Sequence, residues 1–303
     1  MFGRLLLASS LFSLCSCAAL PAPQSVAPVD QTAWAEQCSD WDEWDKPGPA
    51  FRILGNTYYV GTCGIAAILI TGDEGHVLID TGTEAGAEVV RTNIEALGFE
   101  LRDIRIILQS HEHFDHVGGV AKMQRWTGAR VIASEEAAVV LASGTPSPND
   151  PQHGILPEME SAEVSGTVSN GEMLQLGSIQ FTAIATPGHT PGALTWSWSS
   201  CSGTVIGDVC ASIGYADSLS AISADNYRFS DHPEYVRAYR DGIARLAELD
   251  CDILITPHPS ASGMRDKLLE GDLTNGMDCA AYAANRLARL EARLARETEE
   301  AAE

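Results

Sequence analysis

The chain has 303 residues, 45% of them hydrophobic, and a formal net charge of -22 at pH 7. A globular chain of this size buries a sufficient core without structural staples. Because a surface with this excess of carboxylates repels phosphates, the composition argues against nucleic acid and anionic membrane surfaces as partners.

The N-terminal residues are typical of a secretory signal. Arg4 precedes an apolar run over 5–14, and small residues follow it, which predicts a signal peptide over 1–17 and a periplasmic destination. This run is too short to span a bilayer, and no later segment is apolar enough to do so. The sequence Leu-Cys-Ser-Cys at 14–17 resembles a lipoprotein cleavage box, which leaves lipidation of Cys17 open. We interpret residues 18–40 as an N-terminal arm and residues 41–303 as the folded domain.

Six cysteines lie beyond the signal region, and an even number in an exported chain predicts three disulfides. The sequence does not choose among the pairings that six cysteines allow, and free buried thiols are the alternative. Their spacing is not that of a zinc ribbon. These cysteines are Cys38, Cys63, Cys201, Cys210, Cys251 and Cys279.

Apolar patterning predicts strands and helices in two roughly equal halves. In the first half we expect strands within 51–60, 65–71, 76–80 and 104–108, and a helix over 84–97. In the second half we expect strands within 173–184, 193–199, 205–215 and 253–256, and helices over 233–249 and 279–300. This order favours an α/β architecture of two mixed sheets packed face to face with helices outside. Residues 143–163 are expected to form a long loop, either a lid or a solvated connector.

The most informative stretch is the sequence Ser-His-Glu-His-Phe-Asp-His at 110–116, directly after an apolar strand. Alternate residues of an extended strand end face the same side, so His111 and His113 point together. A helix that begins here turns Asp115 and His116 toward a second, nearby point. Imidazole and carboxylate are ligands that suit zinc, so the motif predicts two metal ions close together.

Two further histidines follow apolar strands. His189 lies in the turn Thr-Pro-Gly-His-Thr-Pro-Gly at 186–192, and His258 lies in Thr-Pro-His-Pro at 256–259. A single histidine of this kind is more often a surface or core residue than a ligand. Because both accompany the dense motif, we interpret them as metal ligands.

The order of these motifs resembles the signature of the metallo-β-lactamase superfamily over almost the whole mature chain. The resemblance implies an αββα sandwich with the site at the sheet edge between the halves. It also implies one zinc ion held by three histidines and a second held by an aspartate and two histidines. The first set is His111, His113 and His189; the second is Asp115, His116 and His258.

The chain resembles subclass B3 in particular, because Ser218 stands where subclasses B1 and B2 carry a cysteine ligand. This resemblance implies hydrolysis of penicillins, cephalosporins and carbapenems, with Ser218 and Ser220 facing the substrate carboxylate. Ordinary turn residues are the alternative interpretation of the two serines. The same resemblance implies the disulfides Cys38–Cys63, Cys201–Cys210 and Cys251–Cys279. We expect a monomer whose partner is a small β-lactam.

The mechanism that the resemblance implies uses a hydroxide shared by two Zn²⁺ ions. Zinc lowers the pKa of bound water toward about 7, so hydroxide is present at neutral pH. Asp115 would orient it, and His113 and His189 complete the catalytic set.

Three alternatives remain open at this point. A glyoxalase II-like thioesterase shares the histidine motif and adds a bridging aspartate; Asp217 lies one residue from that register. An acyl-homoserine lactonase shares the metal site. A non-catalytic binding module with the same fold would hold much less than one zinc per chain. The secretion signal favours β-lactams, whose targets lie in the periplasm.

Overall fold

The structure is a computed structural model that describes residues 30–204 and 207–301. The expected signal peptide with Cys17, and the expected arm as far as residue 29, lie outside these ranges. Within them, no helix combines the length and the apolar character needed to cross a bilayer.

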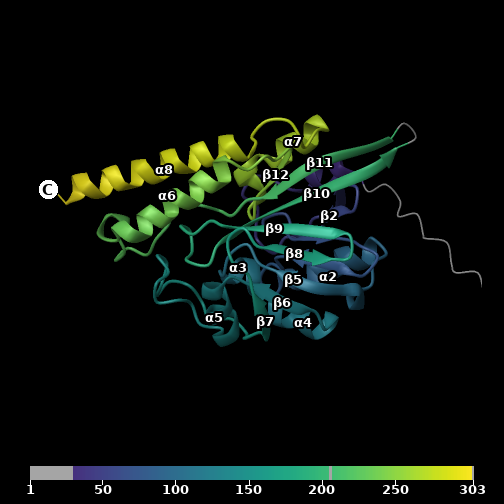
Figure 1. The fold of residues 1–303 in the computed structure, drawn as a ribbon, viewed down its shortest axis with the longest axis horizontal. Helices are drawn as coiled ribbons and strands as arrows, with labels where there is room; N and C mark the ends of the chain where they lie inside the picture. The colour runs from purple at the N-terminus through teal and green to yellow at the C-terminus, as the bar shows by residue number, and fades with distance from the viewer. Residues whose placement is uncertain (1–29, 205–206, 302–303) are drawn as a thin grey trace, which may run out of the picture.

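Two mixed β-sheets pack face to face, with helices on both outer surfaces (Figure 1). The first sheet has the order β1-β2-β3-β4-β5-β6-β7 and is antiparallel from β1 to β4 and parallel from β4 to β7. Its strands are β1 (Phe51–Leu54), β2 (Thr57–Tyr59), β3 (Ile68–Ile70), β4 (His76–Ile79), β5 (Ile104–Leu108), β6 (Arg130–Ala133) and β7 (Val164–Thr167).

The second sheet has the order β12-β11-β10-β9-β8, in which only the β11–β12 pair is parallel. Its strands are β8 (Met173–Leu176), β9 (Ile179–Ala185), β10 (Leu194–Thr204), β11 (Gly207–Tyr215) and β12 (Ile253–Ile255). Because β10 is antiparallel to both β9 and β11, the strands β9, β11 and β12 run in one direction.

The longer helices α2, α4, α5, α6 and α8 lie in two outer layers, as Figure 1 shows. Apolar side chains of α2, α4 and α5 cover the first sheet, and those of α6 and α8 cover the second. The helices are α1 (Gln31–Gln37), α2 (Gly86–Ala96), α3 (Phe114–Val117), α4 (Val120–Thr127), α5 (Glu135–Ser143), α6 (Pro233–Ala247), α7 (Met264–Glu270) and α8 (Cys279–Glu300). The predicted αββα arrangement is therefore confirmed.

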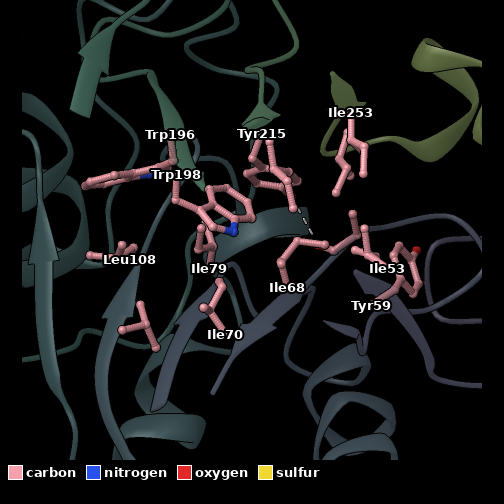
Figure 2. Close-up of a cluster of buried hydrophobic side chains, with 14 of the residues drawn as sticks. Ile53, Tyr59, Ile68, Ile70, Ile79, Leu108, Trp196, Trp198, Tyr215 and Ile253 are labelled. Carbon is pink, nitrogen blue, oxygen red and sulfur yellow. Dashed lines mark hydrogen bonds between the residues drawn. The ribbon is translucent and has the colours of Figure 1, made fainter. Parts of the chain in front are cut away.

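Alternation along the central strands explains this layering. In β5, Ile106 and Leu108 face the other sheet, whereas Ile107 faces the helices, because successive side chains of a strand point to opposite faces. Figure 2 shows the core between the sheets, to which Trp196 and Trp198 of β10 contribute together with Leu108 and isoleucines of the first sheet.

Three disulfides join the pairs that the subclass resemblance implies. Cys38–Cys63 ties the end of α1 to the loop after β2, Cys201–Cys210 crosses the β10–β11 hairpin, and Cys251–Cys279 joins the start of β12 to α8. All six cysteines after residue 17 are thus paired.

The structure differs from the sequence-based prediction in the last part of the arm. Residues 31–37 form α1, whose Trp34 side chain is buried against Phe51 and Tyr59. Asp30 caps this helix by accepting a hydrogen bond from the backbone N–H of Thr32, 2.9 Å away. The folded domain therefore includes α1, and it begins before residue 41.

Candidate metal centre

The topology brings four loops to one edge of the sandwich. The loops that follow β9, β11 and β12 leave the same edge of the second sheet because these strands run in one direction. The loop after β5 meets them there: the carbonyl of Ser110 accepts a hydrogen bond from the backbone N–H of Leu194, 2.7 Å away. The predicted location of the site, at the sheet edge between the halves, follows from this arrangement.

The dense motif changes from strand to helix over a few residues. His111 lies in the short segment after β5, and His113 is the extended N-cap of α3, which turns Asp115 and His116 inward. All four side chains are buried. Their potential ligand atoms form two groups, each with its members within 4.8 Å of one another: His111 with His113 and His189, and His111 with Asp115 and His116.

His189 and His258 both reach the dense motif from distant positions in the sequence. The ring of His189 lies 4.8 Å, centroid to centroid, from both His111 and His113. The ring of His258 lies 4.9 Å from that of His116, and its Nε2 atom is 3.5 Å from Oδ2 of Asp115. The structure therefore brings together all six residues that the sequence selected.

Burial keeps most of these imidazoles neutral. It is the main reason that the pKa values of His111 and His189 lie well below their usual range, and it lowers the pKa of His258 to about 4. Neighbouring histidines lower these pKa values further. His116 differs: burial lowers its pKa, but the carboxylates of Asp115, Asp80 and Asp217 together more than offset this, so its pKa is raised. Neutral imidazoles can bind a metal ion at neutral pH without first losing a proton.

Each histidine of the first group has one ring nitrogen next to an oxygen behind it. Oδ1 of Asp217 lies 2.8 Å from Nδ1 of His111, Oδ2 of Asp150 lies 2.9 Å from Nε2 of His113, and the carbonyl of Ser220 lies 3.0 Å from Nδ1 of His189. These contacts leave the opposite nitrogen of each ring available to a metal ion, an arrangement common around metal-ligating histidines.

Asp150 was not identified from the sequence. It lies in the loop over 143–163, which carries no repeating pattern, and its buried carboxylate also accepts a hydrogen bond from the backbone N–H of Gln152. The only hint available was the position of an aspartate inside a long Pro-containing loop. Asp217, weighed from the sequence as a possible bridging ligand, instead lies behind His111.

Two further buried carboxylates hold the loops, and one of them, Asp80, also lies behind His116, with its Oδ2 atom 3.8 Å from Nδ1 of that ring. Glu112 accepts hydrogen bonds from Oγ1 of Thr190 and the backbone N–H of Gly192, at 2.6 and 2.8 Å. Asp80 accepts hydrogen bonds from Ser110 and from the hydroxyl of Tyr215. Burial raises the pKa of both carboxyl groups. Glu112 thereby ties the dense motif to the loop that carries His189.

The turn that carries His189 depends on a glycine. Gly188 has a φ of 153°, and a Cβ built on it would lie 2.2 Å from Cδ2 of the buried Tyr239 on α6. Any larger residue here would push the turn away from α6. The glycine therefore lets the loop approach closely enough to place His189 in the group.

The donor set fits zinc. Nε2 of His111 is buried and has no hydrogen-bond partner among the described residues, which is costly unless another group satisfies it. Imidazole nitrogens with one carboxylate, in two closely spaced groups, are the ligands that zinc prefers. The residues present thus match a two-ion centre.

A cavity of about 510 Å³ lies beside this centre. Its lining includes His189 and His258 together with the predicted substrate contacts Ser218 and Ser220, and Trp41 and Trp44 form part of its wall. Ile155, in the loop over 143–163, is 61% exposed and is not part of this lining. The loop over 143–163 contributes Asp150 to the centre instead.

Residues 60–258 match the family model described as "Metallo-beta-lactamase superfamily". The chain belongs to this superfamily. It is also similar to solved structures over most of its length. It is 56% identical to the MIM-2 metallo-β-lactamase. That match covers 89% of this chain and 98% of the MIM-2 chain, with a TM-score of 0.84. It is 46% identical to MIM-1 from Novosphingobium pentaromativorans, covering 89% and 99% with a TM-score of 0.85.

A third similar structure is MEM-A1, described as a subclass B3 metallo-β-lactamase isolated from a soil metagenome library. The identity is 41%, the coverage is 85% of this chain and 100% of that one, and the TM-score is 0.78. The predicted resemblance to subclass B3 metallo-β-lactamases, which are hydrolases, is therefore confirmed.

Curated relatives are more distant. A hydroxyacylglutathione hydrolase from Bradyrhizobium sp. (strain ORS 278) is 29% identical over 46% of this chain and 49% of its own length. The probable metallo-hydrolase YflN of Bacillus subtilis is 26% identical over 65% of this chain and 80% of its own length. The chain spans about half the length of the first of these relatives.

Proposed function

We propose that this protein is a zinc-dependent β-lactamase that opens the β-lactam ring of penicillins, cephalosporins and carbapenems. The convergence of five histidines and Asp115 beside a cavity that also contains Ser218 and Ser220 carries the proposal. Similarity to subclass B3 metallo-β-lactamases along nearly their whole length supports it.

Two zinc ions would be held at this centre. His111, His113 and His189 would hold the first, in keeping with their tight grouping. Asp115, His116 and His258 would hold the second, in keeping with the 3.0 and 3.5 Å separations of Oδ2 of Asp115 from the two imidazoles. When bound, zinc supplies a nucleophile from water at neutral pH and polarises a carbonyl oxygen.

Asp115 would orient the attacking water. Burial raises the pKa of its carboxyl group, but the neighbouring His116 and His258 lower this pKa by more than burial raises it. The pKa is therefore below its ordinary value, and the group is ionised at neutral pH. An ionised carboxylate accepts a hydrogen bond from water and so fixes its orientation toward the lactam carbonyl.

Ser218 and Ser220 would position the substrate. The Oγ atom of Ser218 is buried and has no hydrogen-bond partner among the described residues, so it is free to donate to a ligand in the cavity. The hydroxyl of Tyr282 holds the carbonyl of Ser218 at 2.9 Å, which fixes the loop. A carboxylate on the fused ring of a β-lactam is a suitable acceptor, and the indoles of Trp41 and Trp44 offer apolar contacts.

A glyoxalase II-like thioesterase is the second candidate, favoured by the curated hydroxyacylglutathione hydrolases. An acyl-homoserine lactonase shares the proposed metal site. The position of Asp217 behind His111 supports the β-lactamase, because a bridging aspartate would face both ligand groups.

The proposed place of action is the periplasm. Three disulfides suit an oxidising compartment, and β-lactams meet their targets outside the cytoplasm. The experiment that tests the function is turnover of a penicillin, a cephalosporin, a carbapenem, a lactone and a glutathione thioester by the zinc-loaded protein. Preferred hydrolysis of the β-lactams supports the proposal, and preferred hydrolysis of the thioester or lactone contradicts it.

A further inference from the structure

The cavity beside the metal centre has a wall whose charge is opposite to that of the whole molecule. The chain has 41 Asp and Glu residues against 19 Lys and Arg, yet no carboxylate belongs to the described lining of this cavity. Four arginines of α8 line it instead: Arg286, Arg289, Arg293 and Arg296. A local reversal of this kind attracts anions into the cavity.

The sequence of α8 produces this wall. Residues three and four positions apart share one side of a helix, and the four arginines follow that spacing. Glu291 lies on another side of α8, where it forms an ion pair with Arg240 of α6 at 2.7 Å. The helix thus directs its positive charges to the cavity and an acidic residue to its neighbour.

Two of the four arginines are held in place. Arg293 donates hydrogen bonds to Oε1 of Glu297 at 2.6 Å and to Oγ of Ser223 at 2.7 Å. The guanidinium of Arg286 lies 4.3 Å from the ring centroid of Tyr282, and its Nε atom is buried without a hydrogen-bond partner among the described residues. Arg286 and Arg293 therefore form a fixed part of the cavity wall, and Nε of Arg286 is a donor without a partner among the described residues.

The other two arginines are free to bind a ligand. Arg289 and Arg296 are exposed, and the guanidinium of neither forms an ion pair or a hydrogen bond with another residue in the described ranges. Guanidinium groups recognise carboxylates and sulfonates through paired hydrogen bonds. An anion in the cavity would meet donors with no competing partner.

The same cavity thus offers two places for negative charge. One lies at Ser218 and Ser220, next to His189, and the other lies along α8. A cavity of about 510 Å³ is large enough for a drug-sized ligand that reaches both. A β-lactam with one carboxylate on its fused ring and a second anionic group on a substituent has this distribution of charge.

We propose that Arg289 and Arg296 form a second anion subsite that selects β-lactams carrying a carboxylate or sulfonate outside the fused ring. This inference rests on the proposed function. The two arginines act on substrate binding and take no part in the bond-breaking step, so they determine specificity through KM.

Benzylpenicillin and its α-carboxy derivative provide a matched substrate pair that differs by one carboxylate. In the zinc-loaded R289Q/R296Q variant, we expect KM for the α-carboxy derivative to rise about five- to tenfold with kcat nearly unchanged. KM for benzylpenicillin should change less than about twofold. Added salt should raise KM for the dianion more steeply in the wild type than in the variant, because ions screen exposed charges.

The variant R102Q/R237Q is the matched control, because it removes the same amount of charge from exposed arginines outside the cavity lining. It should leave both KM values unchanged. Equal effects of R289Q/R296Q on the two substrates, or an equal effect of the control, would overturn the subsite while leaving the β-lactamase function intact. A wild-type protein that hydrolyses neither penicillin would overturn the proposed function and the subsite together.

Discussion

Oδ2 of Asp150 lies 2.9 Å from Nε2 of His113, although 37 positions separate the two residues in the sequence. This contact fixes which nitrogen of His113 faces the other histidines. It also gives the loop over 143–163 a role in the metal centre that is independent of any motion over the substrate.

The first prediction follows from this contact. Replacing Asp150 by Asn removes the carboxylate that orients His113, so zinc affinity should fall about 10- to 100-fold. Competition with a chromogenic chelator measures this change. Asn149→Ala, at the exposed neighbouring position, should leave affinity unchanged; the same loss in that variant would assign the effect to the loop as a whole.

Asp217 provides a second test, because its place behind His111 differs from that of a bridging ligand. Asp217→Asn should weaken zinc binding while the protein still binds two ions at saturating zinc. Metal analysis after equilibrium dialysis gives the number of ions bound. Loss of one whole ion at saturation would mean that the carboxylate is itself a ligand.

The turn at His189 predicts the effect of adding one methyl group. Gly188→Ala places a Cβ against the ring of Tyr239 in a backbone conformation that L-residues rarely adopt. The free energy of unfolding should fall by about 2–4 kcal/mol, and zinc binding should weaken with it. Urea unfolding with zinc titration measures both.

Gly166→Ala is the matched control for this change, because no heavy atom lies within 4 Å of the added Cβ. Its stability should stay within about 0.5 kcal/mol of the wild type. Equal stability of the two variants would show that the turn can move away from α6 without cost.

Glu297 predicts a dependence of stability on pH away from the metal centre. Burial raises the pKa of Glu297, but hydrogen bonds from Ser230 and Arg293 lower this pKa by more. The pKa in the folded protein therefore lies below the usual value. The stabilisation is therefore present above the pKa of an unfolded glutamate, about 4.3, and is lost as the pH falls through the folded value.

Glu297→Gln should lower the free energy of unfolding by about 1–2 kcal/mol at pH 7 and by less in acid. Chemical denaturation at several pH values checks this. The exposed Glu299→Gln is the control, which should have little effect at any pH. A loss that is the same at pH 3 and pH 7 would exclude the ionised carboxylate as its cause.

The sequence could indicate the six candidate ligands, which the structure brings together, because most of them follow apolar strands. His111 and His113 lie directly after β5, and the ligand motif occupies only a few consecutive positions. Asp150 could not be predicted in the same way, because its contact with His113 depends on how a patternless loop folds back over the site. The arginines of α8 have helical spacing, but only the packing of α8 shows that they border the cavity.

The helices and strands also differ in how well the sequence predicts them. The helix over 279–300 is long and rich in strong helix formers, so its bounds agree with α8. In contrast, the sequence pattern did not identify β6 and β7, which have four residues each, or α5 between them. Helix α1 was missed because its burial depends on a distant partner, the pair Phe51 and Tyr59.

Carbapenem hydrolysis measured while zinc is returned to chelator-treated protein tests the proposed function most directly. We expect no ring opening without zinc and activity that rises until about two equivalents are bound per chain. Ring opening that persists after zinc is removed, or zinc-loaded protein that leaves every β-lactam intact, would contradict it.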